Sequence, residues 1–200
     1  MKNKVKFLPW IGTHYAKGVN SKRVMALGES HYCNHPNEAV PELTNSVILD
    51  LLNPNSEHEA YKNTYTKFER ALAMKVLDAR EKAALWNSIA FYNYVQVPMS
   101  AARTSPTKDD FTDATEAFFS VLNQYMPDVL IVWGQRLYDN LPDQGEQGKN
   151  LILSDGYTIE TYVYPLSNGH KVYVLPIYHP STGFSWDYWG EAIKMFIERV

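Results

Sequence analysis

Two kinds of apolar pattern along the chain predict strands. Short continuous runs, which are typical of strands covered on both faces, occur at residues 24–27, 87–98 and 128–134. The first run ends at Gly28 and the second at Pro98. Alternating stretches, which predict the arms of a hairpin, occur at residues 157–164 and 171–178. The step Asn168-Gly169 between them is a strong signal for a tight hairpin turn.

Between these strands, apolar residues recur every three or four positions, as on one face of a helix. The predicted helices are residues 38–53, 63–77, 106–126, 135–142 and 185–200. We expect Val76 in the apolar stripe of the second helix. Ser105 is expected to cap the third helix, with Pro106 at its first position.

This order of strands and helices predicts the α/β class. We expect a three-layer α/β/α sandwich with a central, mainly parallel, four-stranded sheet and a C-terminal hairpin. With 200 residues and 45% hydrophobic residues, residues 1–200 suit a single domain with a substantial core.

Composition and charge narrow the class of protein. The net charge of -3 weighs against tight non-specific binding of nucleic acid, although 14 tyrosines and 5 tryptophans suit stacking on flat ligands. The start of the chain lacks a signal-peptide pattern, and no apolar run reaches membrane-spanning length. Cys33 is the only cysteine, which excludes an iron–sulfur cluster built by one chain. We expect a cytoplasmic monomer that does not contact membranes and needs no cofactor.

The candidate chemistry lies where predicted strands end. Ligands of parallel α/β sheets bind beyond the carboxyl ends of the strands. The first strand is followed by "GESHY" (residues 28–32), the second carries Asn93, and the last is followed by His179. These ends offer a carboxylate, an amide and imidazoles, in a cleft lined by aromatic residues: Tyr32, Tyr92, Phe184 and Trp186.

Four blocks in this order resemble the uracil-DNA glycosylase superfamily. They are "GESHY", "FYNYVQVP", "PDVLIVWG" and "YHPSTGFS", within a resemblance that runs from about residue 24 to residue 189. The resemblance implies a four-stranded parallel sheet between helices and a pocket for a base flipped out of DNA. The implied partner is therefore DNA that contains uracil or a related base, and the implied reaction is hydrolysis of its N-glycosidic bond.

Carried over to this chain, the resemblance assigns roles to single residues. Gly28 forms the turn, Glu29 positions water, Asn93 reads the base, and His179 stabilises charge on the leaving base. Tyr32 is the candidate to stack on the base. The implied DNA contacts are Ser181 beside a phosphate, Phe184 or Trp186 in the gap left by the base, and Arg103 near the cleft.

The first block departs from the family pattern. Ser30 stands where one branch has its water-activating aspartate, and His31 replaces a proline. Loss of an anionic base proceeds through an oxocarbenium-like sugar, so Glu29 or a neutral His31 could orient the water. These departures also favour the alternative of a divergent protein of the same fold that binds nucleotides or nucleic acid without cleaving them.

Other interpretations of these residues stay open. His31, Cys33 and His35 have a spacing that invites a metal-dependent hydrolase, although no distant pair of ligands is apparent. A hydrolase with Cys33 as nucleophile, His179 and Glu29 would use the same cleft. Glu29 could also simply form a salt bridge. The basic residues Arg103, Lys108 and Arg136 are expected to be solvated.

Overall fold

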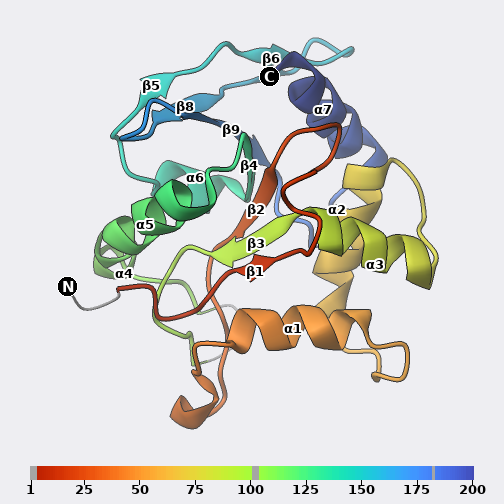
Figure 1. Ribbon diagram of the computed structural model, residues 1–200, viewed down its shortest axis with the longest axis vertical. Coiled ribbons are helices and arrows are strands. Elements are labelled where there is room, and N and C mark those ends of the chain that lie inside the picture. Colours follow the sequence, from red (N-terminus) through yellow and green to blue (C-terminus); the bar gives the residue numbers. More distant parts are fainter. Residues whose placement is uncertain (1–3, 101–103, 182) are drawn as a thin grey trace.

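A mixed sheet of seven strands organises the structure, a computed structural model that describes residues 4–100, 104–181 and 183–200. The strand order is β1-β3-β2-β4-β9-β8-β5 (Figure 1). These strands are Trp10–Ile11 (β1), Val24–Gly28 (β2), Ala90–Asn93 (β3), Val129–Trp133 (β4), Glu146–Gln147 (β5), Tyr162–Pro165 (β8) and Lys171–Ile177 (β9). A separate two-stranded sheet pairs Leu151–Ile152 (β6) with Thr158–Ile159 (β7).

The four central strands of the large sheet run parallel. β2 pairs with β3 on one side and with β4 on the other, and β4 pairs with β9. The edge strands β1, β8 and β5 pair antiparallel, so the described sheet is larger than the four strands expected. The predicted α/β class and the predicted hairpin are confirmed. The hairpin turn between β8 and β9 contains Gly169 at φ +83, and the hairpin belongs to the large sheet.

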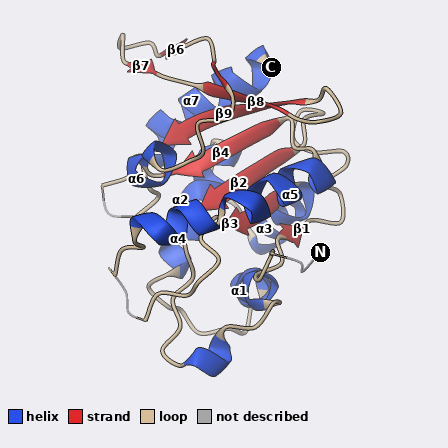
Figure 2. Ribbon diagram, turned by 90° about the vertical axis from the view of Figure 1, so that its left-hand side faces the viewer, coloured by secondary structure: helices blue, strands red, loops and turns tan. Residues whose placement is uncertain are grey.

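Helices pack on both faces of the sheet (Figure 2). They are Leu43–Leu52 (α1), Lys62–Ala73 (α2), Ala79–Ser88 (α3), Lys108–Asp113 (α4), Thr115–Tyr125 (α5), Gln135–Asp139 (α6) and Trp186–Arg199 (α7), and a 3-10 turn lies at Pro36–Glu38 (η1). Within the described part of the chain, no helix combines the length and the apolar composition needed to cross a membrane.

The alternation of side chains along β2 divides the core in two. Val24 and Ala26 face a cluster with α1, α2, α3 and α7, whereas Met25 and Leu27 face a cluster with α4, α5 and α6. All five residues of β2 and all five of β4 are buried. This explains why both strands are apolar without alternation in the sequence.

Helix α3 was not anticipated from the sequence. The run expected as a strand from residue 87 begins inside this helix, and β3 starts only at Ala90. Asp78 caps α3 in a capping box, in which its carboxylate accepts from the Glu81 amide at 2.8 Å and Glu81 accepts from the Asp78 amide. The capping box fixes the start of the helix, and residues 79–88 contain no β-branched residue that would oppose it.

Three predicted helices end or begin elsewhere. The helix expected from residue 38 begins at Leu43, after η1. α2 ends at Ala73 because Met74 adopts the left-handed conformation, and Val76 is 62% exposed rather than part of a buried stripe. The expected long helix from Pro106 is two helices, α4 and α5, which meet at Ala114. Thr107, and not Ser105, caps α4.

Replacement of the α4 cap tests where this helix begins. The Thr107 hydroxyl accepts from the Asp110 amide at 3.2 Å, so Thr107→Ala is expected to lower the free energy of unfolding by about 1 kcal/mol. Ser105→Ala, which removes only an exposed hydrogen bond from Arg136, is the matched control and should lower it by less than Thr107→Ala does. Urea denaturation of both variants measures the difference. A larger loss for Ser105→Ala would contradict the observed helix start.

Candidate functional site

The candidate site lies at the carboxyl ends of β2, β4 and β9. The chain passes from β2 to β3 on one side and then returns to β4 on the other side of β2. Such a reversal leaves a crevice beyond the ends of the two strands, where ligands of open α/β sheets bind. Glu29 follows β2 and Arg136 lies just after β4, so these two side chains meet at this switch point, and we call the region around them the crevice.

Gly28 makes room for a side chain of the neighbouring strand. It pairs with Asn93 in the parallel register of β2 and β3. A Cβ atom at Gly28 would lie 2.2 Å from Asn93 Oδ1 and 3.1 Å from Phe91 Cζ. Only glycine therefore allows the Asn93 amide to occupy this position.

The Asn93 amide begins a buried polar chain. Asn93 is 4% exposed, and its Nδ2 lies 3.1 Å from His31 Nε2. Thr44 of α1, which is fully buried, places its hydroxyl 2.9 Å from the same ring nitrogen. Because an amide nitrogen only donates, His31 Nε2 accepts, and the neutral imidazole carries its proton on Nδ1. Burial lowers the pKa of His31 to about 4, which agrees with this neutral form.

Glu29 forms a two-pronged ion pair with Arg136. Arg136 Nε donates to Glu29 Oε2 at 2.8 Å, and Nη2 donates to Oε1. Nη1 donates to the hydroxyl of Ser105. The Glu29 side chain is 11% exposed and that of Arg136 is 54% exposed. The pair thus joins the ends of β2 and β4 and presents the guanidinium to solvent.

His179 lies beside this ion pair. Its Cβ atom is 3.4 Å from the position of a Cβ atom at Gly134, and its ring meets the Trp133 ring edge to face at 6.4 Å. Desolvation lowers the pKa of His179; Glu29 acts to raise it and Arg136 to lower it. His179 is nevertheless an exposed residue, so its ring can meet a ligand as a neutral imidazole.

The loop that carries Glu29 and His31 is held by backbone bonds. It runs beside residues 94–99: the Gly28 and Glu29 carbonyls accept from the Tyr94 and Val95 amides at 2.9 and 2.8 Å. Tyr32 forms an isolated bridge with residue 99, and its side chain is 51% exposed. The loop is therefore fixed in position, with the Tyr32 ring open to a planar ligand.

Two polar atoms near these strand ends are buried without a hydrogen-bond partner in the described structure. They are Ser30 Oγ and Trp133 Nε1. A buried donor without a partner costs free energy, so such atoms are candidates to bind a ligand or water. The Ser30 hydroxyl cannot replace a carboxylate base, but it can hold a water molecule.

The residues expected to contact DNA differ in how exposed they are. Ser181 is exposed, and its carbonyl accepts from Lys67. Phe184 is 7% exposed and stacks on Trp189 at 6.4 Å, and the half-buried Trp186 packs against the same core. Insertion of either ring into DNA would require it to leave this packing. Arg103 lies outside the described residues.

The metal and cysteine hypotheses gain no geometric support. Among the described residues, no group of three or more histidine, cysteine, aspartate or glutamate side chains is arranged to hold a metal ion. Cys33 is 6% exposed, and burial together with Glu38 raises the pKa of its thiol. A protonated, buried thiol is a poor nucleophile.

The sequence predicted that Glu29, Asn93 and His179 lie at one end of the sheet. It did not identify the residues that contact this group. Arg136 was expected to be solvated, and its side chain is 54% exposed, but it also pairs with Glu29, which confirms the salt bridge left open for that carboxylate. Its place two residues after Gly134, at another strand end, was the available signal. Thr44 had no comparable signal because it lies within the pattern of α1.

No protein-family model and no curated protein sequence matches this chain. The chemistry of the site is therefore argued from its own residues.

The buried state of His31 predicts a pH dependence of stability. The pKa of about 4 in the folded protein is below the ordinary 6.5, so the contribution of the neutral ring is complete above pH 6.5 and is lost as the pH falls toward 4. Between about pH 7.5 and 4.5, wild type is expected to lose about 2–3 kcal/mol of unfolding free energy more than His31→Gln. Urea denaturation over this range measures the difference. Exposed His58 provides the control, because His58→Gln should follow wild type; a His31→Gln curve parallel to wild type would contradict the prediction.

A double-mutant cycle tests the contact of Gly28 with Asn93. Gly28→Ala should cost about 1–3 kcal/mol in wild type, because the new methyl group overlaps Asn93 Oδ1. In an Asn93→Ala background the same change should cost less, since that oxygen is gone. Thermal and urea unfolding of the four proteins give the coupling energy. Equal costs in both backgrounds would show that the amide does not occupy this space.

Proposed function

We propose that this protein hydrolyses the N-glycosidic bond of a deaminated or otherwise damaged base in DNA. Glu29 orients the attacking water, and His179 stabilises the leaving base. The observation that carries the proposal is the placement of His179, after β9, close enough to the Glu29–Arg136 ion pair for both charges to act on its pKa. A carboxylate, a neutral imidazole and a partly exposed guanidinium then face one crevice.

These groups suit the heterolysis of a glycosidic bond. The C1′–N bond breaks, its electron pair goes to the base, and water adds to C1′ while losing a proton. The carboxylate of Glu29 retains free lone pairs beside Arg136 and can accept from that water. A neutral His179 can donate a hydrogen bond to the oxygen of the base on which charge develops.

Arg136 adds a positive charge at the crevice. Its guanidinium can stabilise either a phosphate beside the target sugar or the negative charge on the departing base. Its hold on Glu29 also keeps the carboxylate in one orientation, which favours water positioning over free rotation.

The arrangement of strands and helices also supports the proposal. The order β3-β2-β4-β9 gives four parallel strands, with helices packed on both faces. This is the arrangement that the resemblance to the uracil-DNA glycosylase superfamily implies. DNA is accordingly the proposed partner, with the acidic net charge confining contacts to a local patch.

A second candidate is a protein of the same fold that binds nucleotides or nucleic acid without cleavage. The position of Asn93 favours it: the amide is 4% exposed and already donates to His31. Reading a base with Asn93 would require this buried contact to open. Ser30 in place of a carboxylate points the same way.

An oligonucleotide assay tests the proposed reaction. Single- and double-stranded DNA containing uracil, hypoxanthine or xanthine is incubated with the protein, and alkali converts abasic products to cleaved strands. We expect His179→Ala to lower the rate about 100-fold or more, since it removes the donor to the leaving base. Glu29→Gln should also lower it. Because desolvation lowers the pKa of His179, the ring is neutral above pH 6.5, and activity should persist there.

Matched variants keep this test specific. His58→Ala removes another exposed histidine and should leave the rate unchanged. Absence of abasic product with every base, from protein shown to be folded, would overturn the proposed hydrolysis. Binding of the same DNA without turnover would then support the second candidate.

A further inference from the structure

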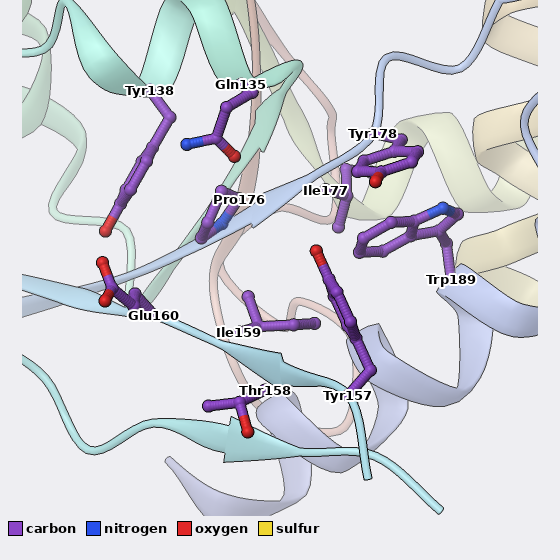
Figure 3. A pocket seen from close by; sticks show the side chains of 10 residues that line it. All are labelled: Gln135, Tyr138, Tyr157, Thr158, Ile159, Glu160, Pro176, Ile177, Tyr178 and Trp189. Atoms are coloured by element: carbon purple, nitrogen blue, oxygen red, sulfur yellow. The ribbon is translucent and has the colours of Figure 1, made fainter. Parts of the chain in front are cut away.

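A cavity of about 260 Å³ lies beside the candidate site, between α6, β7, the end of β9 and α7. Gln135 and Tyr138 of α6 line one side, together with Glu160, and Tyr157, Tyr178 and Trp189 line the other (Figure 3). Ligand pockets for drug-sized molecules are usually about 300–1,000 Å³, so this cavity suits a single ring system.

The aromatic side of the cavity has open ring surfaces. Tyr157 is 44% exposed and Tyr178 is 54% exposed, whereas Trp189 between them and the core is 4% exposed. The Tyr178 ring lies 4.8 Å from Trp189, and the Tyr157 ring meets Trp189 edge to face at 6.4 Å. Aromatic rings that stay open to solvent on a buried support are suited to stacking on a planar ligand.

This wall is held in place before any ligand arrives. β7 pairs with β6, and Ile159 of β7 is buried in the core with Trp189. The Tyr188 hydroxyl donates to Asp155 at 3.0 Å, which ties the turn of this hairpin to α7. A preformed wall lowers the entropic cost of binding.

The polar edge of the cavity presents hydrogen-bond acceptors. Glu160 contributes a carboxylate, and Gln135 leaves its carbonyl oxygen available because its Nε2 donates to Asp139 at 2.7 Å. None of the residues that line the cavity is lysine or arginine. This edge suits a ligand with N–H donors and opposes a phosphate group.

We propose that this cavity binds a planar heteroaromatic base that carries an exocyclic amino group, such as adenine. The ring stacks on Tyr157, and the amino group donates to Glu160. The base can come from a free nucleoside or from an unpaired nucleotide of a strand. The site does not depend on the proposed hydrolysis, since none of its groups takes part in that reaction.

Adenosine and inosine form a matched pair of probes, because an exocyclic amino group of one is a carbonyl in the other. Binding of each is measured by calorimetry and by quenching of tryptophan fluorescence. We expect adenosine to bind about tenfold tighter, as expected for a hydrogen bond to a charged acceptor. Glu160→Gln should remove this preference, and Tyr157→Ala should weaken adenosine binding about tenfold to a hundredfold.

Control variants separate this cavity from the strand-end site. Glu198→Gln removes an exposed carboxylate of α7, and it should not alter adenosine binding. Tyr157→Phe keeps the ring and should retain most of the affinity. His179→Ala and Tyr32→Ala change the strand-end site and should leave adenosine binding intact, so a failed glycosylase assay does not decide this proposal.

A second arm uses adenine-containing single-stranded oligonucleotides to identify the source of the base. Weaker adenosine binding by the Tyr157 and Glu160 variants supports a site for free nucleosides. Weaker binding of the oligonucleotide alone supports a site for a base within a strand. The proposal is overturned if neither probe binds, or if both bind as tightly to the two variants as to wild type.

Discussion

The close approach of the Asn93 side chain to Gly28 constrains the whole candidate site. Because no side chain stands at Gly28, the amide reaches the space beside β2 and donates to His31. This bond, together with Thr44, orients the imidazole and keeps it neutral in a buried position. The loop after β2 is thereby tied to β3 and α1, and Glu29, which lies between Gly28 and His31, is held at the crevice.

His31 and His179 each follow a strand of the sheet, but their surroundings suit them to different roles. His31 is 5% exposed and bonded to neighbours, so its neutral form contributes to stability. His179 is exposed; desolvation lowers its pKa, while Glu29 acts to raise it and Arg136 to lower it. A neutral imidazole with an accessible ring can act on a ligand, whereas a buried one cannot without opening the structure. We therefore propose His179, rather than His31, as the histidine that acts on a ligand in the crevice, with Arg136 as a nearby charge that the sequence pattern did not identify.

The sequence predicted well what depends on local pattern. The apolar run of β4 and the Asn-Gly step before β9 identify a buried strand and a hairpin, because both signals are short-range. Predictions failed where long-range contacts decide. The pairing of Arg136 with Glu29 joins residues 107 positions apart. The contact of Thr44 with His31 depends on how α1 packs against the sheet. Neither contact produces a periodic pattern of residues in the sequence.

The same distinction explains why the aromatic cavity was not anticipated. Tyr157 and Tyr178 alternate within stretches that predict strands, so their pattern indicates a hairpin and nothing more. The chain instead interrupts that arm, and residues 158–159 pair with β6 in a separate small sheet. This detour moves Tyr157 and Glu160 away from the large sheet and over the end of β9. A ligand-sized space thus arises beside the crevice from a break in regular pairing, and it presents hydrogen-bond acceptors, whereas Arg136 presents a guanidinium at the strand ends.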